Sequence, residues 1–321
     1  MKPVDFCGIP LRHAVINGSG TFDLKAAVLA FGEAVRERFP FAAFVSKTIT
    51  LEPRAGNPPP RLYETPAGMI NSIGLPGPGV DGYLEADLPE LSSLGVPLFT
   101  NVMGSSAAEV GELFDRVEPR PEIAAVELNV SCPNVRTGLD IGSDPSELTA
   151  LLEAVRSRLS KPLIVKLTPN VTDVAEIARA AEAAGADALS LVNTLRAWAP
   201  HPDRPGDPWL GAGRGCLSGP DIRAVALSQV EAGASSTGLP VVGMGGVSNA
   251  GHAREFLAAG ATLVAVGTES FRDPLAGAAI ADGLGCAPGA GGRSASPAPP
   301  QGHRRPQLEV HPNFCLTGIA P

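Results

Sequence analysis

The sequence predicts an α/β fold, a TIM-type (β/α)8 barrel, from two observations. Short apolar runs recur eight times along the chain, and segments of helical length follow most of them. The later runs, such as LIVKL and LPVVGMGG, are nearly continuous in apolar residues, as expected for parallel strands covered on both faces. Eightfold alternation within 321 residues fits a barrel. An open, doubly wound sheet shows the same alternation and stays as the alternative fold.

The predicted strands are spaced along nearly the whole chain. They cover residues 14–19, 42–48, 97–103, 124–131, 163–168, 188–194, 239–246 and 262–268. Three of the intervening helices have recognisable ends. One starts at Ser143, an N-cap residue, with acidic residues in its first turn. The second runs from Thr172 and Asp173 to Gly185 and the third from Ser248 to Gly260, each with glycine as the stop signal.

Two long interruptions and a tail complete the organisation. Residues 50–80, rich in Pro and Gly, form a long insertion after the second strand. Residues 195–217, which hold both tryptophans, form a lid-like loop after the sixth, and long loops in compact domains are more often functional than accidental. From Gly285 the composition becomes low-complexity Gly, Pro, Ser and Ala. We therefore expect a barrel domain over 1–284 and a disordered tail over 285–321.

Composition excludes several classes of protein. The net charge of −8 argues against nucleic acid as a partner, because phosphate binding needs a basic surface. No apolar run approaches the roughly 20 residues of a membrane span, and the first residues, MKPVDFCGIP, have neither a signal region nor a lipidation motif. We expect a cytoplasmic protein. Its five cysteines are dispersed, and no pair has CxxC spacing, which argues against a metal or iron–sulfur site and against a disulfide framework.

Polar residues gather where the predicted strands end, which is where barrels carry their chemistry. Lys47 and Lys166 lie inside apolar strands, where a lysine needs an anionic partner. An ion pair with a neighbouring acid is one interpretation. Two lysines at one mouth favour a bound ligand instead. Four asparagines at strand ends likewise suit a polar, planar ligand, although each alone would be explained as a loop cap.

The last two strands end in Gly245-Gly246 and Gly267-Thr268. Barrels commonly hold a phosphate at this position, on backbone N–H groups near a helix N-terminus. Turns also need glycine, so the position carries more weight than the residue type. No GxGxxG opens a helix after a strand, so a Rossmann nicotinamide site is not indicated.

Cys132 follows the fourth strand within VELNVSCPN. A free cysteine is usually a small buried hydrophobe, and that interpretation suits Cys7 and Cys216. Cys132 precedes a proline in a polar loop, where an accessible thiolate can act as a nucleophile or general base.

These segments together resemble the class 1 dihydroorotate dehydrogenases, FMN-dependent enzymes of pyrimidine biosynthesis. The matching segments are ELNVSCPNV, NSIGLPGPG, VSKTIT, VKLTPN, LVNT, LSGP, GMGGV and AVGT, which span residues 14 to 283. The form GNPPPRLYETPAGMINSIGL is most similar to the NAD-linked 1B subclass. The resemblance implies oxidation of (S)-dihydroorotate to orotate, with hydride transfer from C6 to one FMN per chain.

The resemblance also implies roles for individual residues. Cys132 corresponds to the base that removes the C5 proton. The residues implied to bind substrate are Lys47, Asn71, Ser72, Ile73, Gly74, Leu75, Asn129, Asn134, Asn193 and Thr194. Those implied to bind FMN are Ser19, Lys47, Thr48, Asn101, Asn129, Lys166, Val192, Gly219, Gly245, Gly246, Gly267 and Thr268.

The resemblance implies a partner as well. Members of the 1B subclass work with an electron-transfer subunit that carries FAD and a [2Fe–2S] cluster, around a homodimeric core of a heterotetramer. Two alternatives stay open at this stage: a flavin-dependent reductase similar to a dihydropyrimidine dehydrogenase module, and a catalytically silent barrel subunit.

Overall fold

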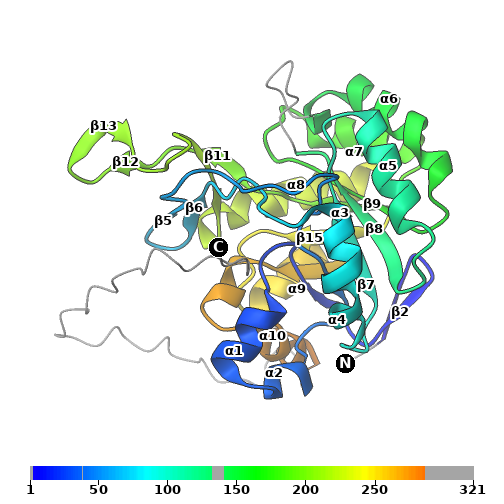
Figure 1. Cartoon of the computed structure of the whole chain (residues 1–321), viewed down its shortest axis with the longest axis horizontal. Coiled ribbons are helices and arrows are strands. Elements are labelled where there is room, and N and C mark those ends of the chain that lie inside the picture. Colours follow the sequence, from blue (N-terminus) through cyan, green and yellow to red (C-terminus); the bar gives the residue numbers. More distant parts are fainter. Residues whose placement is uncertain (1–2, 38, 132–140, 286–321) are drawn as a thin grey trace.

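A computed structural model describes residues 3–37, 39–131 and 141–285 of the chain. Eight parallel strands form one sheet that curls around a central core, with helices outside it (Figure 1). In sequence order these strands are β3 (Val15–Asn17), β4 (Phe44–Val45), β7 (Leu98–Val102), β8 (Ile123–Asn129), β9 (Leu163–Lys166), β10 (Ala188–Leu191), β15 (Val241–Met244) and β16 (Leu263–Val266). All eight predicted strands are present, so the barrel prediction is confirmed.

Within the sheet the strands lie in the order β3-β16-β15-β10-β9-β8-β7-β4, and the barrel closes where the two edge strands, β3 and β4, meet. The backbone N–H of Ala42 donates to the Val15 carbonyl over 2.9 Å. The buried Asn17 amide completes the seam, since it donates to the Val45 carbonyl and accepts from the Val45 N–H, both over 2.8 Å. A side chain thus replaces ladder hydrogen bonds where the two short strands diverge. The open-sheet alternative is wrong.

Side-chain alternation divides the core into two layers. An inner cluster takes at least one residue from every barrel strand, for example Phe99 and Ala125. An outer cluster, which includes Val126 and Leu128, packs between the strands and the surrounding helices. Because successive residues of a strand face opposite ways, this division identifies which polar side chains point into the barrel.

The amino-terminal end of the barrel is covered by a hairpin of β1 (Val4–Phe6) and β2 (Ile9–Leu11). Phe6 and Leu11 are fully or almost fully buried in the inner cluster, and Phe6 stacks on Phe99 with ring centroids 6.0 Å apart. This end is therefore filled with apolar side chains.

Helices surround the sheet and follow most of the strands. They are α1 (Leu24–Phe31), α2 (Ala34–Glu37), α3 (Gly79–Gly82), η1 (Tyr83–Asp87), α4 (Leu88–Ser92), α5 (Ala107–Val117), η2 (Ile141–Ser143), α6 (Pro145–Val155), η3 (Arg156–Arg158), α7 (Val174–Ala183), η4 (Pro220–Ile222), α8 (Arg223–Ser236), α9 (Ala250–Ala258), η5 (Thr268–Phe271) and α10 (Ala276–Gly285).

Two predicted helix starts were wrong by one residue. The N-cap of α6 is Asp144, not Ser143, and that of α9 is Asn249, not Ser248. In both cases the side chain of the capping residue accepts first-turn N–H groups. Asp173 caps α7 as expected, and Gly185 and Gly260 follow their helices with positive φ.

The insertion over residues 50–80 and the lid-like loop over residues 195–217 contain strands that the sequence did not predict. Within them lie β5 (Leu62–Glu64), β6 (Met69–Asn71), β11 (Leu195–Ala197) and β14 (Gly215–Ser218), which form one antiparallel sheet in the order β11-β14-β6-β5. Between β11 and β14, a hairpin of β12 (Pro200–His201) and β13 (Arg204–Pro208) projects from the body of the molecule (Figure 1). Asn71 and Cys216 are paired in this sheet but are 145 residues apart in the sequence. No local sequence pattern predicts such pairing, and the segments are rich in Pro and Gly, which is not typical of strands.

The end of the predicted barrel domain is close to the end of the described chain. Helix α10 runs to Gly285, the first residue assigned to the tail. The rest of that tail lies outside the described residues.

Candidate functional site

A buried polar layer crosses four neighbouring strands near their carboxyl ends. Its centre is Glu127 of β8, which is 2% exposed and follows the alternation that points Ala125 into the barrel. One carboxylate oxygen accepts from Asn101 Nδ2 of β7 over 2.5 Å and lies 3.7 Å from Lys166 Nζ of β9. The other accepts from Ser190 Oγ of β10 over 2.8 Å. Glu127 thus accepts hydrogen bonds from β7 and β10 and forms an ion pair with β9.

This layer confirms one of the two interpretations of Lys166. The ion pair with a neighbouring acid is present, because Glu127 lies beside it. Sequence reasoning missed Glu127, although the same signal was available: a charged residue within the apolar strand VELNV. The ion pair does not exclude a ligand. Lys166 is the last residue of β9 and lies beside Asn129, the last residue of β8, so both are at the end of the barrel where a ligand can reach them.

Asn101 holds an unpaired acceptor. Its side chain is fully buried, and its Oδ1 has no hydrogen-bond partner among the described residues. A buried amide oxygen without a donor costs about 1–3 kcal/mol. An N–H or O–H group of a bound molecule would satisfy it, so Asn101 fits a ligand-binding position.

Asn129 and Asn193 meet across the strand ends. Asn193 Nδ2 donates to Asn129 Oδ1 over 3.3 Å, and Asn129 Oδ1 also accepts from the Ser131 N–H. Asn193 Oδ1 in turn accepts from the Thr194 N–H over 2.9 Å. Asn129 and Asn193, which follow two different barrel strands, are thus brought together.

Ser19, Lys47 and Thr48 lie on the opposite side, at the β3–β4 seam. The hydroxyls of Ser19 and Thr48 are 3.5 Å apart. The Lys47 side chain passes beside Gly20, where an added Cβ would lie 3.7 Å from Lys47 Cγ. The structure therefore brings together these three residues, which come from two separate strand ends.

A cluster of close-packed backbone follows β14, β15 and β16. Gly219 and Gly246 both have positive φ, and a Cβ on Gly246 would lie 2.8 Å from the Gly219 carbonyl oxygen. Gly245 also has positive φ, and it lies beside Val192, since an added Cβ would be 3.6 Å from Val192 Cγ2. Only glycine fits such contacts with left-handed backbone.

Thr268 joins this glycine cluster. Its hydroxyl donates to Ser218 Oγ over 3.0 Å, and it opens the short helix η5 directly after Gly267. Glycines and a hydroxyl therefore lie together after the last two barrel strands, where their side chains leave room beside the backbone. Such a set suits a phosphate, which backbone N–H groups bind directly.

The predicted substrate segment from Asn71 to Leu75 begins at the last residue of β6, in the second sheet, and continues into the loop that follows. Asn71 ends β6 and donates from Nδ2 to the Cys216 carbonyl over 3.3 Å. Ser72 Oγ accepts from Asn57 Nδ2 over 2.9 Å, and the Ile73 carbonyl accepts from the Asn57 N–H. Gly74 and Leu75 have positive φ. The segment is thus fixed by the insertion itself and tied through β14 to Gly219.

Cys132 and Asn134, the predicted base and one predicted substrate contact, lie outside the described residues. Ser131, the last residue described before them, has a buried hydroxyl with no partner among the residues that the structure describes.

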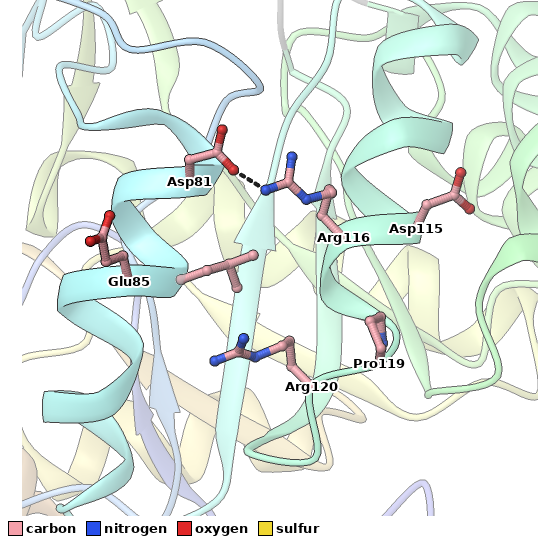
Figure 2. Close-up of a pocket in the computed structure, with 7 residues that line it drawn as sticks. Asp81, Glu85, Asp115, Arg116, Pro119 and Arg120 are labelled. Carbon is pink, nitrogen blue, oxygen red and sulfur yellow. Dashed lines mark hydrogen bonds and ion pairs between the residues drawn. The ribbon is translucent and has the colours of Figure 1, made fainter.

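A hollow on the surface lies away from this site. It has a volume of about 520 Å³, separates α3 and η1 from α5 and is lined by Asp81, Leu84, Glu85, Asp115, Arg116, Pro119 and Arg120. Figure 2 shows Asp81 and Arg116 paired across it. These side chains come from helices on the outside of the barrel and from the turn after α5, so this hollow is not the mouth described above. Exposed ion pairs explain its lining without a ligand.

Two further features concern metals and membranes. Over residues 3–37, 39–131 and 141–285, no group of His, Cys, Asp and Glu is arranged to hold a metal ion. None of the described helices is long and apolar enough to cross a membrane.

Comparisons with known proteins point in one direction. The family model described as dihydroorotate dehydrogenase matches residues 1–286. Curated relatives named dihydroorotate dehydrogenase B (NAD(+)), catalytic subunit, include one from Trichlorobacter lovleyi that is 44% identical over 288 residues, covering 88% of this chain and 93% of that protein. The relative from Geotalea uraniireducens is 43% identical, with 88% and 91% covered. The one from Desulforudis audaxviator is 44% identical, with 88% and 90% covered.

Proposed function

The chain belongs to the dihydroorotate dehydrogenase family, and on that premise we propose that it oxidises (S)-dihydroorotate to orotate in pyrimidine biosynthesis. The observation that carries the proposal is the convergence of Asn101, Asn129, Lys166 and Asn193 at the carboxyl ends of four adjacent strands. Amide and ammonium groups suit a substrate that combines a carboxylate with imide groups.

FMN fits the groups at this mouth. The partnerless Asn101 Oδ1 can accept from a ring N–H, and the Lys166 ammonium can face ring acceptors. The cluster of Gly219, Gly246 and Thr268 suits the phosphate. When bound, FMN supplies the hydride acceptor that no amino acid side chain provides. The remaining FMN contacts that we propose are Ser19, Lys47, Thr48, Asn129, Val192, Gly245 and Gly267.

The side chains supply binding and proton transfer. We propose that Cys132, as thiolate, takes the proton from C5 of dihydroorotate. The C6–H electron pair then leaves as hydride, and the C5=C6 double bond of orotate forms. Substrate is held by Asn129, Asn193 and Thr194, by Lys47 and Asn134, and by the segment from Asn71 to Leu75. Correct alignment of C5 with the sulfur is the contribution of these contacts.

The relatives are named as catalytic subunits of an NAD(+)-linked enzyme, which supports a second subunit for this chain too. We propose that this partner carries FAD and a [2Fe–2S] cluster and delivers the electrons to NAD, and that two copies of the present chain form the core of the assembly.

The proposal is tested by anaerobic mixing of FMN-reconstituted protein with dihydroorotate. We expect the visible flavin absorption to bleach and orotate to appear in equal amount. Protein that binds no FMN, or that keeps its colour with dihydroorotate, contradicts the proposal. Bleaching by a dihydropyrimidine in place of dihydroorotate would assign the site to another substrate.

A further inference from the structure

Glu127 is the carboxylate at the centre of the polar layer, and the proposed chemistry gives it no task. Its side chain is almost completely buried, and the cost of removing a carboxylate from water largely offsets the gain from its ion pair. The ion pair therefore adds little net stability to the barrel, and the main effect of the carboxylate is on the side chains beside it. Those neighbours include two residues, Asn101 and Lys166, at the proposed FMN position.

The carboxylate fixes which way the Asn101 amide faces. A carboxylate accepts hydrogen bonds only, so the Asn101 amino group must turn toward it. Asn101 Oδ1 then points away and has no partner among the described residues. With a neutral group that both donates and accepts in place of Glu127, the amide could turn over and present its amino group instead.

The same carboxylate reduces the positive field of Lys166. Its nearer oxygen is 3.7 Å from Lys166 Nζ, and both side chains are more than nine-tenths buried, where water screens charge weakly. The ammonium on its own would favour any bound group that gains negative charge. Glu127 opposes that preference.

We propose that Glu127 is a positioning residue that sets the charge and hydrogen-bond pattern presented to FMN by Asn101 and Lys166. This inference rests on the proposed function. Reduction adds negative charge to the flavin, so Glu127 weakens the binding of reduced FMN relative to oxidised FMN. It thereby keeps the potential of the bound flavin low, which favours onward transfer of electrons.

The test compares the midpoint potential of bound FMN in wild type, Glu127→Gln and Ser190→Ala. Glu127→Gln removes the charge and keeps the side-chain size. Ser190→Ala is the matched control, because it removes a hydrogen bond to the same carboxylate and leaves the charge. We expect Glu127→Gln to shift the affinity ratio about tenfold toward reduced FMN, which is ~30 mV upward for a two-electron couple. Ser190→Ala should shift it by much less.

An unchanged or lowered potential in Glu127→Gln, or equal shifts in both variants, overturns the inference while leaving the proposed function intact. Wild type that binds no FMN overturns the proposed function itself. If Glu127→Gln does not fold, Glu127→Gln combined with Lys166→Met is expected to fold, because the damage then comes from an unpaired buried ammonium. Failure of this double variant as well contradicts the proposed coupling of the two charges.

Discussion

The two ends of this barrel treat buried polar groups in opposite ways. At the amino-terminal end, burial raises the pKa of the Cys7 thiol to about 11, aided by Asp187 and Asp5, and burial together with Arg12 lowers the pKa of His13 to about 4. Both groups are therefore neutral near pH 7. At the carboxyl-terminal end, Lys166 and Glu127 lie together as an ion pair with donors from neighbouring strands.

This difference indicates that the amino-terminal end of the barrel serves stability and that the carboxyl-terminal end carries the proposed site. The amino-terminal end is sealed by Phe6 and Leu11, and desolvation keeps the Cys7 thiol and the His13 imidazole neutral there. The carboxyl-terminal end retains charge and an unsatisfied acceptor on Asn101, which are features expected of a ligand-binding site. Substitutions at the two ends should accordingly change different properties.

The largest expected effect is that of Cys132→Ala, which removes the proposed base. Loss of a general base should slow the bleaching of bound FMN by dihydroorotate about 10²- to 10⁴-fold at neutral pH, with FMN still bound. Stopped-flow absorbance measures this rate. Cys7→Ala is the matched control and should keep the wild-type rate. Cys7 lies at the amino-terminal end of the barrel, and its raised pKa keeps the thiol protonated. Equal rates in wild type and Cys132→Ala would remove Cys132 as the base.

At the amino-terminal end, Phe6→Ala should reduce stability by about 3–5 kcal/mol through the cavity it leaves against Phe99. Urea unfolding of the protein measures this loss. The FMN affinity of the folded variant should stay close to wild type. A fall in FMN affinity as large as the fall in stability would show that the two ends are not separable.

Gly246→Ala tests the glycine cluster. Gly246 has a positive φ, and an added Cβ would lie only 2.8 Å from the Gly219 carbonyl oxygen. The substitution must therefore displace the backbone at the proposed phosphate position. We expect FMN to bind at least about tenfold more weakly, which corresponds to ~1.4 kcal/mol. Gly95→Ala is the control, since Gly95 also has positive φ but an added Cβ meets nothing within 4 Å. Equal FMN affinity in both variants would argue against a phosphate at the cluster.

His13 should make the amino-terminal end sensitive to acid. Its pKa of about 4 in the folded protein lies below its ordinary value of 6.5, so the unfolded chain binds more protons between these pH values. The contribution of His13 to stability is complete above pH 6.5 and is lost as the pH falls toward 4. We expect it to amount to no more than about 3 kcal/mol, at about 1.4 kcal/mol for each unit by which the pKa is lowered. Chemical denaturation of wild type and His13→Gln across this window measures it, and identical pH profiles would contradict it.

The barrel could be predicted because its strands are short apolar runs whose signals are local in the sequence. The sheet formed by β5, β6, β11 and β14 could not, because its pairing joins segments such as Asn71 and Cys216 that lie far apart in the chain. Within the site, lysines and asparagines at strand ends were evident. Glu127 was missed because its meaning depends on Asn101 and Ser190, which only the closed barrel brings beside it.

Hydrogen exchange of the protein with and without FMN tests most directly whether ligand binding belongs to the carboxyl-terminal end. At short exchange times, before global unfolding contributes, FMN should slow exchange in peptides that contain Lys166, Gly246 and Thr268. Peptides of the β1–β2 hairpin should exchange at an unchanged rate. Protection confined to that hairpin, or to the helices around the hollow of Figure 2, would contradict the assignment of the site.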